Sequence, residues 1–408
     1  MLRGPTTGVT RMSSTTTFPA PIAANERIEA LDVIRGFALF GIFLVNIEWF
    51  TRPWQELGAG IQAGTAALDH TVDWLVYLAA RGKFWVLFSL LFGMGFAVMS
   101  ERLDATGRDF RSVYLRRSAV LMAFGIAHVV LLWSGDILHG YALAALLLLL
   151  ARRMQPTAQL TLGLAIYFGM TLLATVGGIV AAGVKALPNG EAANAEAAAA
   201  AAQVYAHGDY LAITVQRVRD FVFELLVHDI DIVPMALAVF LCGAWLVRSG
   251  RIGDVVAHAA FFRALALAGV AVGAVFGVVM LSGPQAIAGG MHMASSLALA
   301  LGYLGIIAWM LARPATARFV AWLAPVGRMA LSNYLLQSLL ASTIFYGYGL
   351  GMWGRIGRGN QVLLVVVIFA AQVLLSRWWL SRYRFGPAEW LWRWGTYGKR
   401  PAFRVGGS

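Results

Sequence analysis

Apolar stretches long enough to cross a lipid bilayer recur along the whole chain. Of its 408 residues, 59% are hydrophobic and 13% are charged, and the mean hydropathy is +0.70. These values are typical of multi-pass membrane proteins rather than soluble domains. A helical span needs about 20 apolar residues, so we predict an all-α fold, a polytopic transmembrane helical bundle of about ten spans within residues 28–380. The predicted spans are 29–50, 84–99, 116–134, 137–151, 158–184, 229–248, 261–282, 293–312, 326–348 and 361–379.

Positive charge gathers in every second connection between these spans. The net charge is +12, and most basic residues outside the spans fall on one side. By the positive-inside rule this side is cytoplasmic, which places both termini in the cytoplasm and requires an even number of spans. The charge predicts contact with the anionic head groups of a lipid bilayer and argues against nucleic acid as a partner. The signal comes from Arg27, Arg102, Arg111, Arg116, Arg117, Arg152, Arg153, Arg248, Arg251, Arg313, Arg318 and the basic residues after 376.

Three segments lie outside the predicted membrane core. Residues 1–27 are rich in Thr and Ser, and we expect a disordered cytoplasmic tail without a cleavage site. The outer connection 185–228 contains an Ala-rich run followed by an amphipathic stretch, which predicts a helix on the membrane surface. Residues 381–408 interleave Trp with Arg after a Pro, and this pattern predicts a cytoplasmic interfacial helix and tail.

The first predicted span carries three polar residues on one helical face. At 100° per residue, Asp32, Arg35 and Asn46 fall within about 60° of one another, so they must face protein or water. Asp32 and Arg35 are three residues apart and can form a structural clasp, or they can bind a substrate. Asn46 is a candidate catalytic residue, because its amide can orient an acceptor or an acyl carbonyl.

A second group surrounds the predicted outer hairpin between the third and fourth spans. It contains His128, Asp136 and His139. Asp136 stands where a helix needs an N-cap, and capping is its plainer interpretation. A His next to an Asp at a membrane boundary also supplies a general base and the carboxylate that orients it. All three residues are therefore candidate catalytic residues.

Two further groups are candidates for binding a charged substrate. Arg81 and Lys83 lie in an outer segment, where positive charge is normally sparse, and predict either bound anionic substrate or lipid phosphate, or snorkelling to head groups. In the inner half of the ninth span, Arg328 precedes Asn333 and Gln337, which share one helix face. The two amides are also typical of helix–helix hydrogen bonds, whereas Arg328 favours a polar cavity that holds a phosphate.

The sequence does not indicate metal chemistry or a soluble type of active site. The outer histidines, His70 among them, are not at the spacing of metal ligands. Cys242 is the single cysteine, which excludes an intramolecular disulfide and a multi-cysteine metal site. We therefore expect no metal and no covalently bound cofactor.

Five separated motifs carry a family resemblance. They lie at 27–36 with 44–46, 82–84 with 88–93, 133–138, 327–334 and 385–392. In this order they resemble the bacterial YeiB-like, DUF418 family, which implies the inner (plasma) membrane of a bacterium. The first half is also similar to the catalytic region of heparan-α-glucosaminide N-acetyltransferase and related membrane acyltransferases. That similarity implies transfer of an acyl group from a cytoplasmic donor to a hydroxyl or amine on the far side.

The acyltransferase resemblance assigns roles to some residues and departs at others. Its opening motif matches Asp32 and Arg35, and Asn46 would correspond to a site residue. The essential His of the transferase follows that Asn closely, whereas the first His here is His70, much farther along. The histidines of the outer hairpin, with their neighbouring carboxylate, are the alternative source of a base.

These patterns lead to two functional hypotheses. The first is a membrane-bound O- or N-acyltransferase that takes acyl-CoA as co-substrate and a lipid or small molecule such as a sugar as acceptor. Arg328, with Arg116, Arg117 and Arg153, would then lie near the CoA phosphates. The second is a transporter or flippase of an anionic or amphipathic small molecule. A homodimer is compatible with either hypothesis.

Overall fold

The structure is a computed structural model that describes residues 28–53, 67–107, 109–183, 188–227 and 229–405. These residues form helices and no β-strand, which confirms the predicted all-α bundle. The predicted tail 1–27 lies outside the described residues. Among the described residues, eight helical segments are long and apolar enough to cross a membrane. They are α1 (Glu29–Trp49), α2 (Ala67–Ala79) taken together with α3 (Lys83–Ala105), α4 (Phe110–Leu131), α6 (Pro156–Gly183), α9 (Asp229–Arg248), α10 (Ala259–Ser282), α11 (Gln285–Leu311) and α15 (Arg358–Leu380).

The remaining helices are shorter or less apolar. Two predicted spans, 137–151 and 326–348, correspond to α5 and α14, so the number of ten spans stays a prediction. A further pair, α7 and α8, forms the connection for which we predicted a surface helix. The bounds are α5 (Leu138–Leu148), η3 (Leu149–Ala151), α7 (Pro188–His207), α8 (Tyr210–Val227), α12 (Pro314–Val320), η4 (Ala321–Leu323), α13 (Ala324–Arg328), α14 (Ala330–Phe345) and α16 (Pro387–Tyr397).

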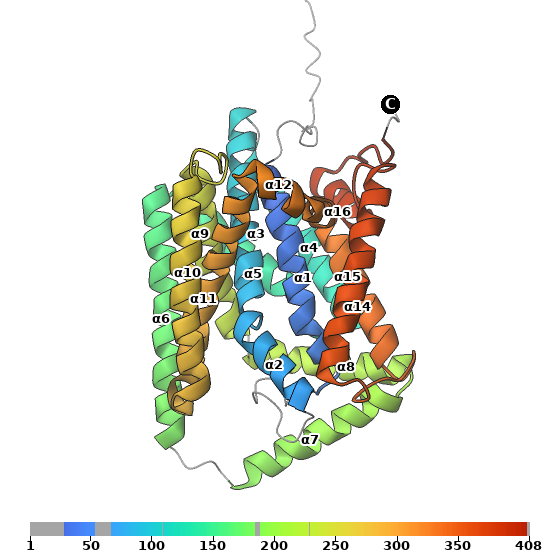
Figure 1. Ribbon diagram of the computed structural model, residues 1–408. Coiled ribbons are helices and arrows are strands. Elements are labelled where there is room, and N and C mark those ends of the chain that lie inside the picture. The colour runs from blue at the N-terminus through green and yellow to red at the C-terminus, as the bar shows by residue number, and fades with distance from the viewer. Residues whose placement is uncertain (1–27, 54–66, 108, 184–187, 228, 406–408) are drawn as a thin grey trace, which may run out of the picture.

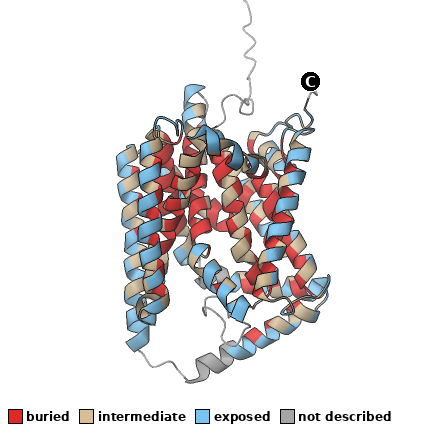
Figure 2. Ribbon diagram, viewed as in Figure 1, coloured by how far each residue is buried: buried red, intermediate tan, exposed pale blue. Residues whose placement is uncertain are grey.

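The long helices form two groups that meet at α1, α3 and α5. Helices α6, α9, α10 and α11 stand together on one side, and α14 and α15 stand with α1 on the other (Figure 1). Buried residues concentrate between the groups, whereas α6, α10 and α15 are exposed outward (Figure 2). Their exposed side chains include Leu172, Val275 and Leu374. Apolar side chains on an outer surface of this extent are typical of contact with lipid.

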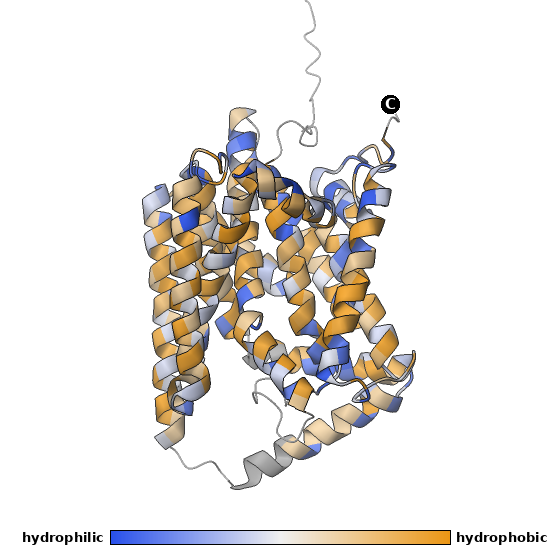
Figure 3. Ribbon diagram, viewed as in Figure 1, coloured by the Kyte–Doolittle hydropathy of each residue, from blue (hydrophilic) through white to orange (hydrophobic). Residues whose placement is uncertain are grey.

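Two ends of the bundle differ in their residues. We call one end the Arg-rich face: it contains the last turns of α3, η3 and α9 together with α12 and α16, and carries Arg152, Arg248 and Arg313. The other end, the opposite face, contains α2, α7 and α8 (Figure 1). Hydrophilic residues gather at both ends and apolar residues between them (Figure 3). Helix α1 begins at the Arg-rich face, and the last described residues lie there too. The cytoplasmic location of this face stays a prediction.

The polar side of α8 faces the protein, and its apolar side faces outward. Arg217 is fully buried and donates a hydrogen bond to the Leu131 carbonyl at the end of α4, at 3.0 Å. Leu211, Val215 and Val222 are exposed. This orientation suits a helix whose apolar stripe lies in lipid while its charged side closes over the end of the bundle.

The C-terminal helix α16 supplies the cap of a helix inside the bundle. The carboxylate of Glu389 accepts hydrogen bonds from the backbone N–H groups of Leu331 and Ser332, at 2.7 and 3.0 Å, and from the Ser332 hydroxyl at 2.5 Å. Burial raises the pKa of Glu389, and the hydrogen bonds from Ser332 and Leu331 oppose that rise. Helix α14 has no side-chain cap from its own N-terminal residues. The backbone donors of its first turn instead find their acceptor in Glu389, which lies 57 positions after Ser332 in the sequence.

Substitution of Glu389 tests this cap. Glu389→Ala leaves two backbone donors buried without acceptors and is expected to lower the free energy of unfolding by about 1–3 kcal/mol. Glu389→Gln keeps an acceptor oxygen and should lose less than half as much. Thermal unfolding of the detergent-purified variants measures both, and equal losses in the two variants would exclude the capping role.

Candidate functional site

Three polar residues meet where α4 turns into α5. The Nδ1 atom of His128 lies 2.9 Å from Oδ1 of Asp136, and Nδ1 of His139 lies 3.2 Å from Oδ2 of the same carboxylate. The backbone N–H of His139 also donates to Oδ2, at 3.0 Å. All three residues are buried, with exposed fractions of 1 to 3%. Asp136 therefore caps α5 and holds both imidazoles at once, so the two interpretations of this residue are compatible.

The state of Asp136 determines the state of His128. Burial raises the pKa of the Asp136 carboxyl, but hydrogen bonds from His128 and His139 outweigh this and hold the pKa below its usual range. An ionised carboxylate only accepts hydrogen bonds, so Nδ1 of His128 carries the proton that it donates. In the neutral ring, Nε2 is then a lone-pair acceptor. This Nε2 atom is buried and has no hydrogen-bond partner among the described residues.

The surroundings of the His128 ring are mainly aromatic. The ring of Tyr334, on α14, lies 4.9 Å away, and the ring of Trp133 lies 6.1 Å away. On α4, Gly125 makes room for the carboxylate, because a Cβ there would stand 2.7 Å from Oδ2 of Asp136. The low dielectric of such a site strengthens the interaction between the imidazole and the carboxylate.

A narrow cleft approaches this cluster from the opposite face. It is lined by aromatic rings of α1 and the hairpin and by residues of α7 and α8. Tyr205 of α7 donates a hydrogen bond to Asp220 of α8 at 2.5 Å, and the Trp133 ring stacks on Phe50 at 4.5 Å. The lining residues are Trp49, Arg52, Trp133, Ser134, Gly135, Tyr205, Asp220 and Tyr346. Residues of α7 and α8 therefore cover this cleft, whose lining includes Ser134 and Gly135, the two residues before Asp136.

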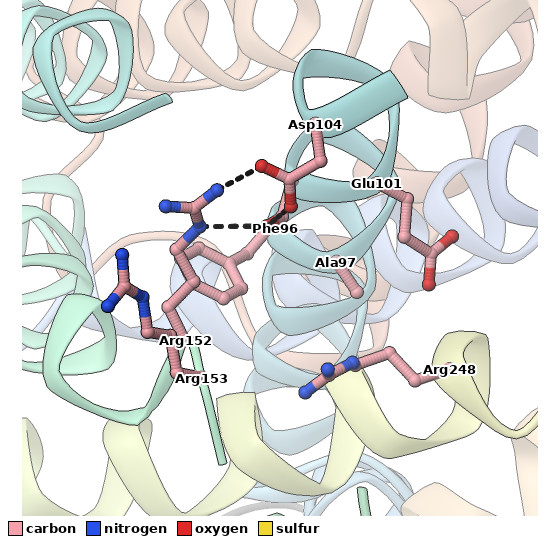
Figure 4. A pocket seen from close by; sticks show the side chains of 8 residues that line it. Phe96, Ala97, Glu101, Asp104, Arg152, Arg153 and Arg248 are labelled. Atoms are coloured by element: carbon pink, nitrogen blue, oxygen red, sulfur yellow. Dashed lines mark hydrogen bonds and ion pairs between the residues drawn. The ribbon is translucent and has the colours of Figure 1, made fainter. Parts of the chain in front are cut away.

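A larger cavity, of about 380 Å³, opens at the Arg-rich face (Figure 4). Arg152 forms an ion pair with Asp104 and donates to the Ser100 hydroxyl at 3.2 Å. Arg153 and Arg248 also line this cavity (Figure 4). Three guanidinium groups and two carboxylates, of Glu101 and Asp104, line the cavity, and Arg152 is paired with Asp104. Guanidinium groups are suited to binding phosphate. Of the four arginines assigned to CoA phosphates from the sequence, the structure places Arg153 here; Arg116, Arg117 and Arg328 do not line this cavity.

The other candidate catalytic residues, Asn46 and His70, are not part of the histidine cluster. Asn46 is half-buried, and no described residue hydrogen-bonds its side chain. It lies one helical turn before Phe50, whose ring stacks on Trp133, so α1 turns this side toward the hairpin. His70 is exposed on α2, and no described contact brings it to Asp136.

The charge pair of the first span forms as predicted. Arg35 and Asp32 are 2.8 Å apart, and both are partly exposed at the Arg-rich face. Arg35 also lies 3.5 Å from the carbonyl of Gly327 at the end of α13. A structural clasp between α1 and α13 explains these contacts, and Arg328 is the next residue of the same α13 turn.

Asn333 and Gln337 form hydrogen bonds between α14 and α15. The Asn333 amide donates to Ser376 at 2.9 Å, and the Gln337 amide donates to Gln372 at 2.9 Å. Gln372 in turn donates to the backbone carbonyl of Asn333 at 2.9 Å. All four side chains are buried. These hydrogen bonds between α14 and α15 explain both amides as helix–helix contacts, and no bound substrate is needed to account for them.

A buried ion network near the opposite face was not predicted from the sequence. Arg358, at the start of α15, lies 3.4 Å from Glu48 and 3.3 Å from Asp73, and Arg52 lies 2.7 Å from Glu48. Glu48, Asp73 and Arg358 have exposed fractions of 5 to 6%. The signal available in the sequence was Glu48 itself, because a carboxylate within a predicted span needs a cation.

Lys83 and Arg81 have different surroundings. Lys83 is fully buried, whereas Arg81 is half-buried and stacks on the Tyr77 ring, 4.7 Å from its centre. Burial of Lys83 contradicts the interpretation that this side chain snorkels to the head groups. No group of three His, Cys, Asp or Glu side chains suited to a metal ion occurs in the part of the chain that the structure describes.

Comparison with known proteins finds relatives over nearly the whole chain. A family model described as "Protein of unknown function (DUF418)" matches residues 246–399. The "Uncharacterized protein YxaH" of Bacillus subtilis is 31% identical over 400 residues, which cover 92% of this chain and 96% of the relative. The "Uncharacterized protein YeiB" of Escherichia coli is 29% identical and covers 90% of this chain and 96% of the relative. No solved structure matches the chain.

Proposed function

The chain belongs to the DUF418 family, and from the chemistry of its two polar sites we propose that it is an integral membrane acyltransferase. It would move an acyl group from acyl-CoA, bound at the Arg-rich face, to a hydroxyl or amine of a lipid or sugar. One observation carries the proposal: Asp136 holds His128 through Nδ1, while the buried Nε2 has no described partner. This is the arrangement of a general base and its orienting carboxylate.

His128 acts as the base in the proposed reaction. The acceptor oxygen or nitrogen attacks the thioester carbonyl carbon, and its proton passes to Nε2 of His128. The carbon–sulfur bond then breaks, and the CoA thiolate takes the proton from the imidazolium. Asp136 stabilises this imidazolium and keeps the ring in the tautomer in which Nε2 is the acceptor. Asn46, on the side of α1 turned toward the hairpin, is the candidate donor to the carbonyl oxygen.

The cavity lined by Arg152, Arg153 and Arg248 is the proposed site of the CoA phosphates. From His139 to Arg152, α5 and η3 span about 20 Å along the helix axis. A donor held by its phosphates at the Arg-rich face therefore needs a long arm to bring its thioester to His128. The pantetheine arm of CoA has this character, which supports acyl-CoA rather than a compact acyl phosphate as donor.

Calorimetry with the detergent-purified protein tests the donor site. Arg153→Ala is expected to weaken acyl-CoA binding about 10- to 100-fold, the effect of losing one hydrogen bond to a charged group. Arg251→Ala is the matched control, because Arg251 lies on the same face, stacks on Trp245 and does not line the cavity. Absence of binding by acetyl-CoA and by longer acyl-CoA would contradict the proposal, as would equal affinity in the two variants.

A transporter or flippase is the second candidate, because two helical segments are interrupted. Helices α2 and α3 are separated at Gly82, and α13 and α14 at Met329. Secondary transporters bind substrates at broken helices near the bilayer midplane. The interruption at Gly82 lies about 33 Å along α3 from the Arg-rich end of that helix, close to the opposite face. This position supports the transporter less than the histidine cluster supports the acyltransferase.

A further inference from the structure

Lys83 is buried at the start of α3 without a counter-ion from the described residues. Its exposed fraction is 0%, and its ammonium group donates one hydrogen bond, at 3.3 Å, to the backbone carbonyl of Tyr77. The charged side chain that acts on it electrostatically is Arg81, which carries the same sign. A buried ammonium without a counter-ion costs several kcal/mol, so such groups are normally paired with a carboxylate or another anion.

Two more polar side chains reach the same place. The Ser296 hydroxyl and the Nδ1 atom of His292, both on α11, are buried and have no hydrogen-bond partner among the described residues. A Cβ at Gly82 would stand 2.5 Å from the Ser296 hydroxyl and 2.6 Å from Nε2 of His292, which places both side chains beside the α2–α3 junction. Gly82 has φ 80°, a conformation that glycine adopts without strain.

The backbone at this junction places the N-terminus of α3 next to the C-terminus of α2, which ends at Ala79. Lys83 is the first residue of α3, so the N-terminus of a helix of 23 residues begins here. The positive end of a helix dipole and its free N–H groups favour an anion. Lys83, Arg81 and the helix terminus supply positive charge, while Ser296 and His292 supply unused hydrogen-bonding atoms.

The outward side of α2, which lies next to this site, is apolar. Leu68, Trp74 and Leu75 are exposed on α2, and a helix with an exposed apolar face at the end of a membrane bundle lies in the interfacial region. Trp is enriched at this depth. The anion that reaches Lys83 past α2 is therefore expected to belong to a lipid molecule.

We propose that Lys83, with Arg81, Ser296 and His292, binds the phosphate of an anionic lipid from the leaflet at the opposite face. The lipid phosphate provides the counter-ion that the described residues do not supply at Lys83, and the acyl chains of the lipid pack against the exposed side of α2. The site is separate from His128 and Asp136, and lipid binding there is not part of the proposed acyl transfer. The proposal of a lipid site does not depend on whether the protein transfers acyl groups.

Lys83→Met tests the site, because methionine fills a similar volume without charge. In lipid-free detergent the variant should unfold at the same temperature as wild type or a higher one, since it removes a buried unpaired charge. Added phosphatidylglycerol should raise the unfolding temperature of wild type and should bind the variant at least tenfold more weakly in native mass spectrometry. Lys399→Met, an exposed lysine at the Arg-rich face, should behave as wild type, and diacylglycerol should not bind the site.

Several results would overturn this proposal. Equal phosphatidylglycerol binding by wild type and Lys83→Met would exclude Lys83 as a ligand of the phosphate. Stabilisation by inorganic phosphate as strong as that by the lipid would assign the site to a free anion instead. If Lys83→Met fails to fold, Ser296→Ala is tested instead. This variant retains the charge of Lys83 and should weaken phosphatidylglycerol binding by a few fold. Unchanged binding would contradict the proposed site.

Discussion

His128→Asn is expected to lower kcat for acyl transfer about 10²- to 10⁴-fold, the usual contribution of a general base. The asparagine amide still donates to Asp136 in place of Nδ1–H, so the hairpin keeps its hydrogen bond while the Nε2 base is lost. The KM for acyl-CoA should change little, because the donor phosphates are proposed to bind about 20 Å away. Steady-state initial rates of transfer from radiolabelled acetyl-CoA, measured with the purified protein over a range of acetyl-CoA concentrations, give both parameters.

His258→Gln is the matched control for this experiment. His258 lies just before α10 at the Arg-rich face, and its ring contacts the backbone carbonyl of Asp254. Its substitution should leave kcat within a factor of two. A wild-type rate in folded His128→Asn would remove His128 from the mechanism, and loss of activity in His70→Gln would assign the base to His70 instead.

Arg358→Met is expected to lower the free energy of unfolding by about 3–5 kcal/mol, which is the usual cost of removing one partner from a buried ion pair. The variant leaves Glu48 and Asp73 buried with Arg52 alone, which lies 2.7 Å from Glu48 but 3.8 Å from Asp73. Arg358 also donates to the Leu44 carbonyl at 3.2 Å and so joins α15 to α1. Unfolding in detergent, followed by tryptophan fluorescence, measures the loss.

Arg355→Met provides the comparison, because Arg355 is exposed three residues earlier. Its substitution should change stability by less than 0.5 kcal/mol, as is usual for surface positions. Arg358→Lys should lose less stability than Arg358→Met. Lysine keeps the positive charge but lacks the several N–H donors with which the guanidinium group reaches two carboxylates. Similar losses in Arg355→Met and Arg358→Met would show that the network adds nothing specific.

Local patterns in the sequence predicted the local features of this protein. Apolar runs predicted the long helices, because lipid forces backbone hydrogen bonds to form within each segment. The spacing of Asp136 and His139 predicted their contact, because three residues are nearly one helical turn. The pair Asp32 and Arg35 formed for the same reason. In each case, both partners lie within one helix or at its end.

Contacts between distant segments were not predictable in the same way. Arg358 meets Glu48 across 310 positions of sequence, and the register between α1 and α15 depends on the packing of the whole bundle. Burial of Lys83 depends on α11, which begins more than 200 residues later. The sequence showed a charge at the edge of a span but not which helices enclose it.

The cap that Glu389 provides for α14 has a consequence for synthesis of the chain. Helix α14 leaves the ribosome before α16, so its first backbone donors enter the bundle without their acceptor. The bundle is completed when residues after 386 arrive and Glu389 reaches Leu331 and Ser332. A nascent chain that stops before this point leaves the backbone donors of Leu331 and Ser332 without the carboxylate that accepts from them.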